Sequence, residues 1–164
     1  MPKGGLLSPF SFLRLGASGT FFNGLLTGRT AVQAARDELL ELYSRLDEEL
    51  AALQSACRTC GRCCDFSTHE NVLYASRLER EVLRLAGTPP ADAPPGVCPY
   101  LREGKCTART ERTLGCRTHF CDRHAAAVGR DLYEKYRRRI AAISRAHGIP
   151  WDYRPVLDEL PPAE

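Results

Sequence analysis

The clearest periodic pattern of hydrophobic residues lies in residues 30–56, where large apolar side chains recur at helical spacing. The repeat consists of Val32, Leu39, Leu46 and Leu53, with Leu42, Tyr43 and Leu50 beside it. This spacing predicts an amphipathic helix, and Thr30 with Gln33 fits a capping box at its start. Two uses of the apolar stripe are open. It can pack against the rest of the chain or form a coiled-coil dimer, although the heptad lasts under four repeats.

A second helical pattern occupies residues 122–147 and ends at Gly148. Its inner face is predicted to consist of Val128, Leu132, Tyr136, Ile140 and Ile143. Beyond this helix, Trp151 and Tyr153 are expected to pack back on the domain. Residues 155–164 are expected to form a tail.

Shorter elements are predicted between the two long helices. Ser76 and Glu79 form a capping box that opens a short helix, and Gly87 ends it. The residues of this helix predicted to point inward are Leu78, Val82, Leu83 and Leu85. Residues 71–74 are apolar enough for a short strand. A tight turn at Glu103-Gly104 predicts a β-hairpin.

The N-terminal residues 1–29 show no helical or strand period and are expected to be a flexible leader. Polar residues interrupt the continuous apolar centre that a secretory signal requires, and no stretch approaches the ~20 apolar residues of a membrane span. Without an export signal we expect a cytoplasmic protein, whose thiols stay reduced. The net charge is only +3, from 23 basic and 20 acidic residues, which gives no argument for nucleic-acid binding.

The cysteines carry the strongest chemical signal, because all eight lie between residues 57 and 121. Four form the run Cys57-Arg-Thr-Cys60-Gly-Arg-Cys63-Cys64, and the others are Cys98, Cys106, Cys116 and Cys121. Such a C-x-x-C-x-x-C-C run has few explanations besides metal binding, because a tight turn brings its thiolates to one centre. Gly61 supplies the backbone freedom for that turn. All eight thiols are therefore candidate metal ligands.

The spacing leaves the identity of the metal open. The C-x-x-C-x-x-C part reproduces the spacing that binds a [4Fe–4S] cluster in bacterial ferredoxins, whose remote fourth cysteine precedes a proline, as Cys98 precedes Pro99 here. Zinc is the alternative, although a second C-x-x-C knuckle is missing. Two zinc ions, mononuclear iron and disulfides are further alternatives. Because adjacent side chains diverge, Cys64 is either a ligand of a second centre or a thiol without metal.

Other polar residues accompany the cysteines in the sequence. They are the histidines His69, His119 and His124, the arginines Arg58, Arg62 and Arg117, and the acids Asp65, Glu70 and Glu79. His119 can turn toward a metal, although a surface or supporting position is the simpler interpretation. Arginines near a negatively charged thiolate cluster stabilise it. Turn chemistry explains Asp65, and the capping box explains Glu79.

Several motifs occur in a fixed order between residues 57 and 121. They are Cys57-x-x-Cys60-Gly61-x-Cys63-Cys64, Glu79, Cys98-Pro99-Tyr100-Leu101, Gly104-x-Cys106 and Leu114-Gly115-Cys116-Arg117. In this the chain resembles the YkgJ-type cysteine-cluster family of bacterial and archaeal proteins. The family's usual Arg-Pro before the Cys-Arg pair is Arg112-Thr113 here, which removes a rigid turn but no ligand. The resemblance implies a zinc- or iron-chelating domain, often an iron–sulfur protein.

We therefore expect a mainly α fold: a small, irregular, cysteine-rich metal-binding domain over residues 30–154, bracketed by the two long helices and containing a minor β-hairpin. The expected function is a cytoplasmic iron–sulfur protein with a redox or accessory role and a protein or redox partner, acting without nucleic acid or membrane. The first alternative is a zinc-binding structural or interaction domain. The second is an enzyme with an open metal position near Asp65, Arg117 or His119. The third is a thiol-based redox sensor or metal chaperone, with Cys63-Cys64 or Cys121 exchanging.

Overall fold

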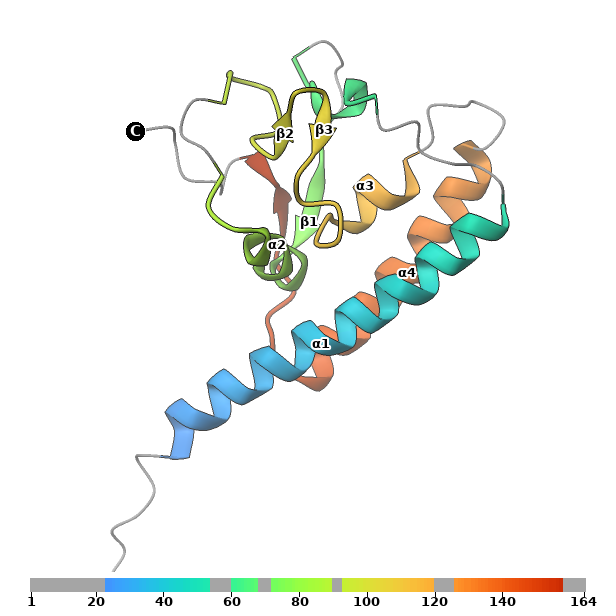
Figure 1. The fold of residues 1–164 in the computed structure, drawn as a ribbon. Helices are drawn as coiled ribbons and strands as arrows, with labels where there is room; N and C mark the ends of the chain where they lie inside the picture. Colours follow the sequence, from blue (N-terminus) through green and yellow to red (C-terminus); the bar gives the residue numbers. More distant parts are fainter. Residues whose placement is uncertain (1–22, 54–59, 68–71, 90–92, 120–125, 158–164) are drawn as a thin grey trace, which may run out of the picture.

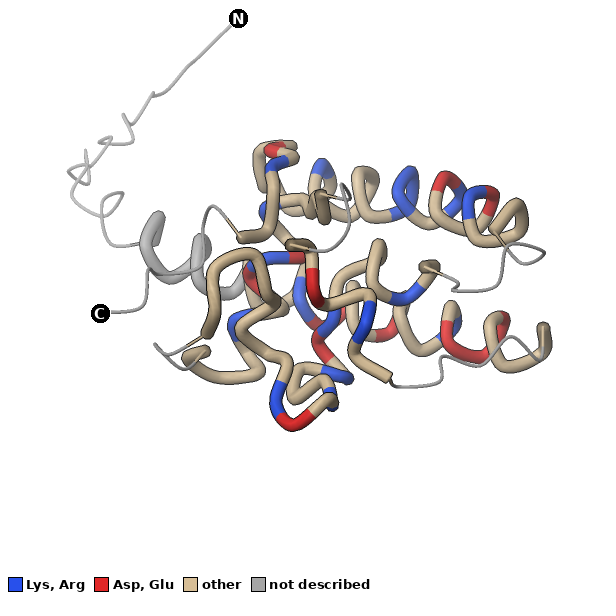
Figure 2. Tube along the Cα trace, turned by 90° about the horizontal axis from the view of Figure 1, so that it is seen from above, with Lys and Arg blue, Asp and Glu red and all other residues tan. Residues whose placement is uncertain are grey.

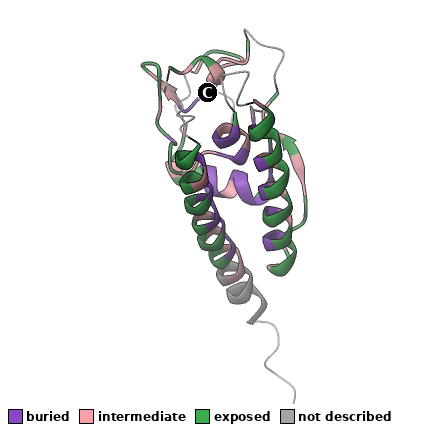
Figure 3. Ribbon diagram, turned by 90° about the vertical axis from the view of Figure 1, so that its right-hand side faces the viewer, coloured by how far each residue is buried: buried purple, intermediate pink, exposed green. Residues whose placement is uncertain are grey.

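A computed structural model describes residues 23–53, 60–67, 72–89, 93–119 and 126–157 of the chain. Its frame is a pair of long helices, α1 (Asn23–Ala52) and α4 (Ala126–Ala146), which run antiparallel beside each other (Figure 1). Two shorter helices, α2 (Arg77–Leu83) and α3 (Leu114–Thr118), pack against the long ones. Buried residues lie on the facing sides of these helices, and the outer sides are exposed (Figure 3).

One apolar core joins all four helices. Its fully buried members include Leu39, Tyr43 and Leu46 of α1, Leu78 and Val82 of α2, Leu114 of α3, and Tyr136 and Ile140 of α4. Burial of one such side chain contributes about 1.5–3 kcal/mol. Most of the predicted stripe on the first helix, from Leu39 to Leu50, is thus covered by other elements of the same chain, and a coiled-coil partner is not needed to bury it.

The boundaries of the long helices differ from those predicted. Helix α1 begins at Asn23, so the predicted leader loses residues 23–29 to the helix, and residues 1–22 lie outside the described part. Thr30 is inside α1, so the capping box predicted there is wrong, and the side chain of Gln33 donates instead to Asp37 Oδ1 at 2.9 Å. Helix α4 is described from Ala126, since residues 120–125 lie outside the described residues.

Three apolar residues predicted to point inward are exposed: Leu53, Leu85 and Val128. Each lies at or beyond a helix end. Leu53 follows α1, Leu85 belongs to the 3₁₀ turn η2 (Arg84–Ala86) after α2, and Val128 is in the first turn of α4. The helical period that predicts an inner face holds only where a complete turn packs against a neighbour.

The short helix α2 begins as predicted. Ser76 Oγ accepts from the Glu79 N–H at 3.4 Å, and Glu79 Oε2 accepts from the Ser76 N–H at 2.7 Å, which makes a complete capping box. The chain then passes through η2 and stops at Gly87, whose φ of +96° suits glycine. Both signals were local in the sequence, and both are confirmed.

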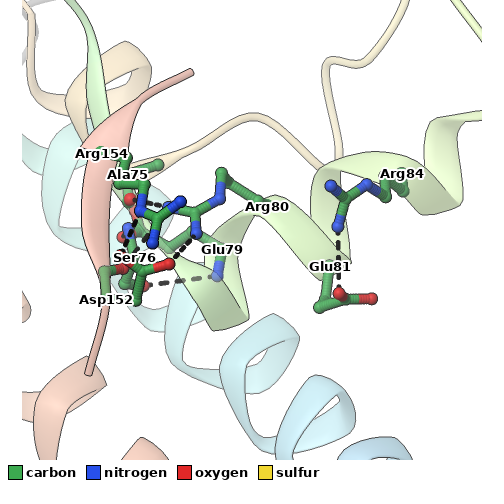
Figure 4. A network of polar contacts seen from close by, with 8 residues as sticks. All are labelled: Ala75, Ser76, Glu79, Arg80, Glu81, Arg84, Asp152 and Arg154. Atoms are coloured by element: carbon green, nitrogen blue, oxygen red, sulfur yellow. Dashed lines mark hydrogen bonds and ion pairs between the residues drawn. The ribbon is translucent and has the colours of Figure 1, made fainter. Parts of the chain in front are cut away.

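A small sheet joins β1 (Tyr74–Ser76) to β4 (Tyr153–Pro155) in antiparallel fashion, with Ala75 opposite Arg154. Arg80 fastens this sheet to α2, because its guanidinium donates to the Ala75 carbonyl at 2.6 Å and to Asp152 Oδ2 at 2.8 Å (Figure 4). The strand predicted at residues 71–74 begins only at Tyr74, and its partner strand was not predicted. Tyr153 does pack back on the domain, stacked on Tyr74 with ring centroids 5.8 Å apart.

The second sheet is the predicted hairpin, formed by β2 (Leu101–Arg102) and β3 (Lys105–Cys106). Glu103 and Gly104 form its two-residue turn with φ values of +47° and +74°, the left-handed pair that tight hairpins prefer. The prediction of a mainly α fold is confirmed, with two small two-stranded sheets among the described residues where one hairpin was expected.

The surface shows no simple electrostatic division. Acidic and basic residues are interspersed along the described chain (Figure 2). Within the described residues, no helix combines the length and apolar character needed to cross a membrane.

Candidate metal centre

Six of the eight cysteines belong to the described residues, and they come from four separate segments. Cys60, Cys63 and Cys64 lie in or beside the 3₁₀ turn η1 (Arg62–Cys64), Cys98 precedes the hairpin, Cys106 is in β3, and Cys116 is in α3. All six are free thiols, and all but the exposed Cys60 are partly buried. Cys57 and Cys121 lie outside the described residues.

Backbone pairing brings the cysteine run to the segment before the hairpin. Asp65 and Val97 form an antiparallel bridge. On either side of it, the Cys98 N–H donates to the Cys64 carbonyl at 2.7 Å and the Phe66 N–H donates to the Gly96 carbonyl at 2.8 Å. Residues 64 and 98 are therefore direct neighbours, although 33 positions separate them in the sequence.

Gly61 lets the cysteine run pack closely on the hairpin. Its φ of +72° is in the left-handed region, as the sequence predicted for this turn. A Cβ atom at residue 61 would lie 2.8 Å from Leu101 Cδ1 and 3.1 Å from the Gly104 carbonyl oxygen. The close approach brings the turn that carries Cys63 and Cys64 onto the hairpin that carries Cys106.

Helix α3 holds Cys116 from the other side, and buried polar groups fix this helix. The hydroxyl of Thr113 donates to Cys116 Sγ at 3.4 Å. The carboxylate of Glu79 accepts from the Leu114 N–H at 3.0 Å and from the Tyr43 hydroxyl at 3.2 Å. Because Glu79 also caps α2, one carboxylate ties the start of α3 to α1 and α2. The capping role predicted for Glu79 is confirmed.

The thiols interact with one another. Cys63, Cys64 and Cys98 affect one another's protonation. The hydrogen bond with Cys64 and then burial raise the pKa of Cys63 far above the ordinary value. The hydrogen bond from Cys63 lowers the pKa of Cys64, but the bond to Cys98 and burial raise it to about 12 overall.

Cys98 and Cys116 differ in the protonation that their surroundings favour. The hydrogen bond from Cys64 lowers the pKa of Cys98. Burial raises the pKa of Cys116 to about 11, and the neighbouring Cys106 and Cys63 act in the same direction. Several half-buried thiols of this kind cannot all become thiolates without a cation, because each new negative charge opposes the next. The donor set therefore suits a bound cation with affinity for sulfur, such as zinc or iron.

Arg112 is a cation whose influence on the thiols the sequence reasoning missed. Its charge acts on both Cys63 and Cys116 in the direction that lowers their pKa, although burial and thiol contacts outweigh it. The side chain is largely buried, with Nη2 3.7 Å from Asp47 Oδ1. Its Nε has no hydrogen-bond partner among the described residues. The sequence signal was its place directly before Thr113 and four residues before Cys116, where Arg117 is the arginine next to the cysteine.

Arg117 lies next to Cys116 in the sequence but interacts mainly with α1. Its guanidinium pairs with Asp47 and lies 4.2 Å from the centroid of the Tyr43 ring. It also donates to the carbonyls of Thr110 and Arg112, so it orders the loop before α3. None of these contacts is with a cysteine thiol, so they do not support the predicted role of Arg117 in stabilising a thiolate cluster. Its described contacts are those of a residue that anchors α3 and holds Arg112 in place.

The other candidate residues named from the sequence differ in where they lie. His119 is exposed just after α3, which agrees with the simpler interpretation. Asp65 accepts from the Ser67 N–H at 3.1 Å, which is the predicted turn chemistry. Arg62 is exposed. Four others lie outside the described residues: Arg58, His69, Glu70 and His124.

Among the described residues, no three His, Cys, Asp or Glu side chains are arranged as a group that could hold a metal ion. Comparisons of the chain with protein-family models, curated proteins and solved structures find no match. The evidence on function therefore comes from the chemistry of the thiols and of the residues around them.

Proposed function

We propose that this chain is a cytoplasmic metal-binding protein whose cysteine thiolates hold an iron–sulfur cluster in a redox or accessory role. One observation carries the proposal: five partly buried free thiols from four segments are close enough to affect one another's protonation. They are Cys63, Cys64, Cys98, Cys106 and Cys116. An apolar environment disfavours grouped thiolates unless a cation joins them. The resemblance of residues 57–121 to the YkgJ-type family supports the same proposal.

The ligands would come from the five interacting thiols together with Cys57, Cys60 and Cys121 of the same motifs. When bound, an iron–sulfur cluster supplies a store for electrons, and the protein sets its potential through charge, hydrogen bonds and solvent exposure. Arg112 would offset the negative charge of the thiolates, and the Thr113 hydroxyl would orient the sulfur of Cys116. The rigid contacts of Glu79 and Arg117 would keep α3 in position.

A structural zinc ion is the second candidate, and the packing around the cysteines favours it in one respect. The apolar cluster on this side of the molecule is small: its buried members are Ala75, Leu83, Tyr100, Ala108 and Val156. Cys98 and Cys106 pack against it. A metal ion that joins the surrounding segments would stabilise a region whose apolar core is limited, as zinc does in small domains.

Metal and acid-labile sulfide analysis of the chain purified without oxygen tests the proposal. We expect about four irons and four sulfides per chain, with an absorbance near 400 nm. One or two zinc ions without sulfide would support the structural zinc site instead. Cys116→Ser should lower the metal content more than Cys60→Ser, because Cys116 is partly buried and feels the charges of Cys63 and Cys106, whereas Cys60 is exposed. A folded chain without metal, whose thiols all react freely, would overturn both candidates.

A further inference from the structure

Cys64 and Cys98 are placed opposite each other by the backbone. In an antiparallel pair the two residue numbers of every opposed couple have the same sum, so the bridge between Asp65 and Val97 sets Cys64 against Cys98. The Cys98 N–H donates to the Cys64 carbonyl at 2.7 Å, which holds this couple together. Directly opposed residues of an antiparallel pair carry their side chains on the same face, so the two thiols lie beside each other.

This arrangement suits a disulfide bond better than the other close pair does. Opposed residues of antiparallel strands have Cα atoms about 4.5–5.5 Å apart, which is within the range that disulfides adopt, about 4.4–6.8 Å. Cys63 also contacts Cys64, but adjacent Cα atoms are about 3.8 Å apart, and a bond between them would be strained. Of these two partners, Cys63 would form a strained bond with Cys64 and Cys98 a favourable one.

We propose that Cys64 and Cys98 form a reversible disulfide when the metal-free chain meets a peroxide. One of the two sulfurs attacks the peroxide and becomes a sulfenic acid, with release of water. The other sulfur then displaces hydroxide, which leaves as a second water, and the S–S bond forms. The two sulfurs together lose two electrons, which reduce the peroxide, and a dithiol restores both thiols by exchange.

The disulfide would control the loading of the centre. It removes two thiols from the candidate ligand set and fixes the turn with Cys63 against the segment before the hairpin. A bound metal would in turn protect both sulfurs, because a thiolate that ligates a metal is a weaker nucleophile. The bond itself depends only on the backbone register, so the inference goes beyond the proposed function and holds for any metal.

Mass-spectrometric mapping of the full-length chain tests this inference. The chain is treated with increasing hydrogen peroxide, as purified and after chelation, then alkylated and digested, while circular dichroism monitors folding. The first disulfide in both samples should join Cys64 and Cys98, and it should form at least about tenfold more slowly before chelation if metal is present. Cys63→Ser should retain this product, whereas Cys64→Ser and Cys98→Ser should lose it.

Two outcomes would overturn the inference. One is a different first disulfide, such as Cys63–Cys64, and the other is the absence of any disulfide in a chain that remains folded. If chelation unfolds the chain, the order of disulfide formation in the sample as purified decides. Metal content is measured on the same samples, so failure of the proposed metal centre and failure of the disulfide are seen separately.

Discussion

Replacement of Glu79 by alanine should destabilise the fold more than any other single removal of a polar side chain considered above. The carboxylate is almost completely buried and accepts three hydrogen bonds, from the Ser76 N–H, the Leu114 N–H and the Tyr43 hydroxyl. Alanine would leave all three donors buried without an acceptor. Each unsatisfied donor costs about 1–3 kcal/mol, but partial rearrangement and water entry limit the sum. We expect a loss of about 3–5 kcal/mol in the free energy of unfolding.

A glutamine at residue 79 distinguishes the effect of the side chain's volume from the effect of its hydrogen-bond acceptors. Glu79→Gln keeps the volume and one oxygen, but its amide group would face one of the backbone donors, so we expect a loss of about 1–3 kcal/mol. Glu48→Ala is the matched control, because Glu48 is an exposed glutamate on α1, and its loss should stay within about 0.5 kcal/mol. Urea unfolding followed by far-UV circular dichroism measures all three variants in the same metal state. A loss for Glu79→Ala no larger than that of Glu48→Ala would refute the reasoning.

Three further predictions concern the surroundings of the thiols and the core. Arg112→Met should weaken metal binding by about 10–100-fold in chelator competition, with Arg112→Lys intermediate, because the cation beside Cys63 and Cys116 is lost; unchanged affinity would contradict this role. Gly61→Ala should cost about 1–3 kcal/mol in urea unfolding and more than Gly104→Ala, since both have positive φ but only residue 61 lacks space for a Cβ; equal losses would exclude the clash. Burial raises the pKa of Tyr43, so its contribution to stability is complete below about pH 10 and is lost as the pH rises further. Stability should therefore fall less steeply above pH 10 in Tyr43→Phe than in the unaltered chain, and identical slopes would refute this.

The elements that the sequence predicted well are those with signals within a few residues. The helical period around Leu39 and Leu46 and that around Tyr136 and Ile140 each marked a helix, because an amphipathic face repeats along one element. The Ser76–Glu79 capping box and the turn at Glu103 needed even less context. The predicted positions of the helix ends were less accurate. Residues 23–29 show no periodic signal in the sequence, so the predicted start of α1 was seven residues too late.

Strand pairing between distant segments could not be read from the sequence. Strands β1 and β4 have three residues each, too few to show a period, and they join residues 74–76 with residues 153–155. Their pairing depends on where α2 lies, because Arg80 connects β1 with Asp152, the residue directly before β4. Such an arrangement follows from the sum of contacts across the molecule rather than from local preference.

The same division holds for the cysteines. Their number and spacing were enough to predict metal chemistry, because the character of a thiol ligand belongs to the residue type and the turn that presents it. The sequence did not indicate that Cys64 opposes Cys98, that Arg112 acts on two of the thiols, or that Arg117 turns to α1. Residue type and the local periodicity of hydrophobic residues determine structure only within a short stretch of the chain. Neighbours in space, and hence charge, hydrogen bonding and reactivity at the thiols, depend on how the whole chain packs.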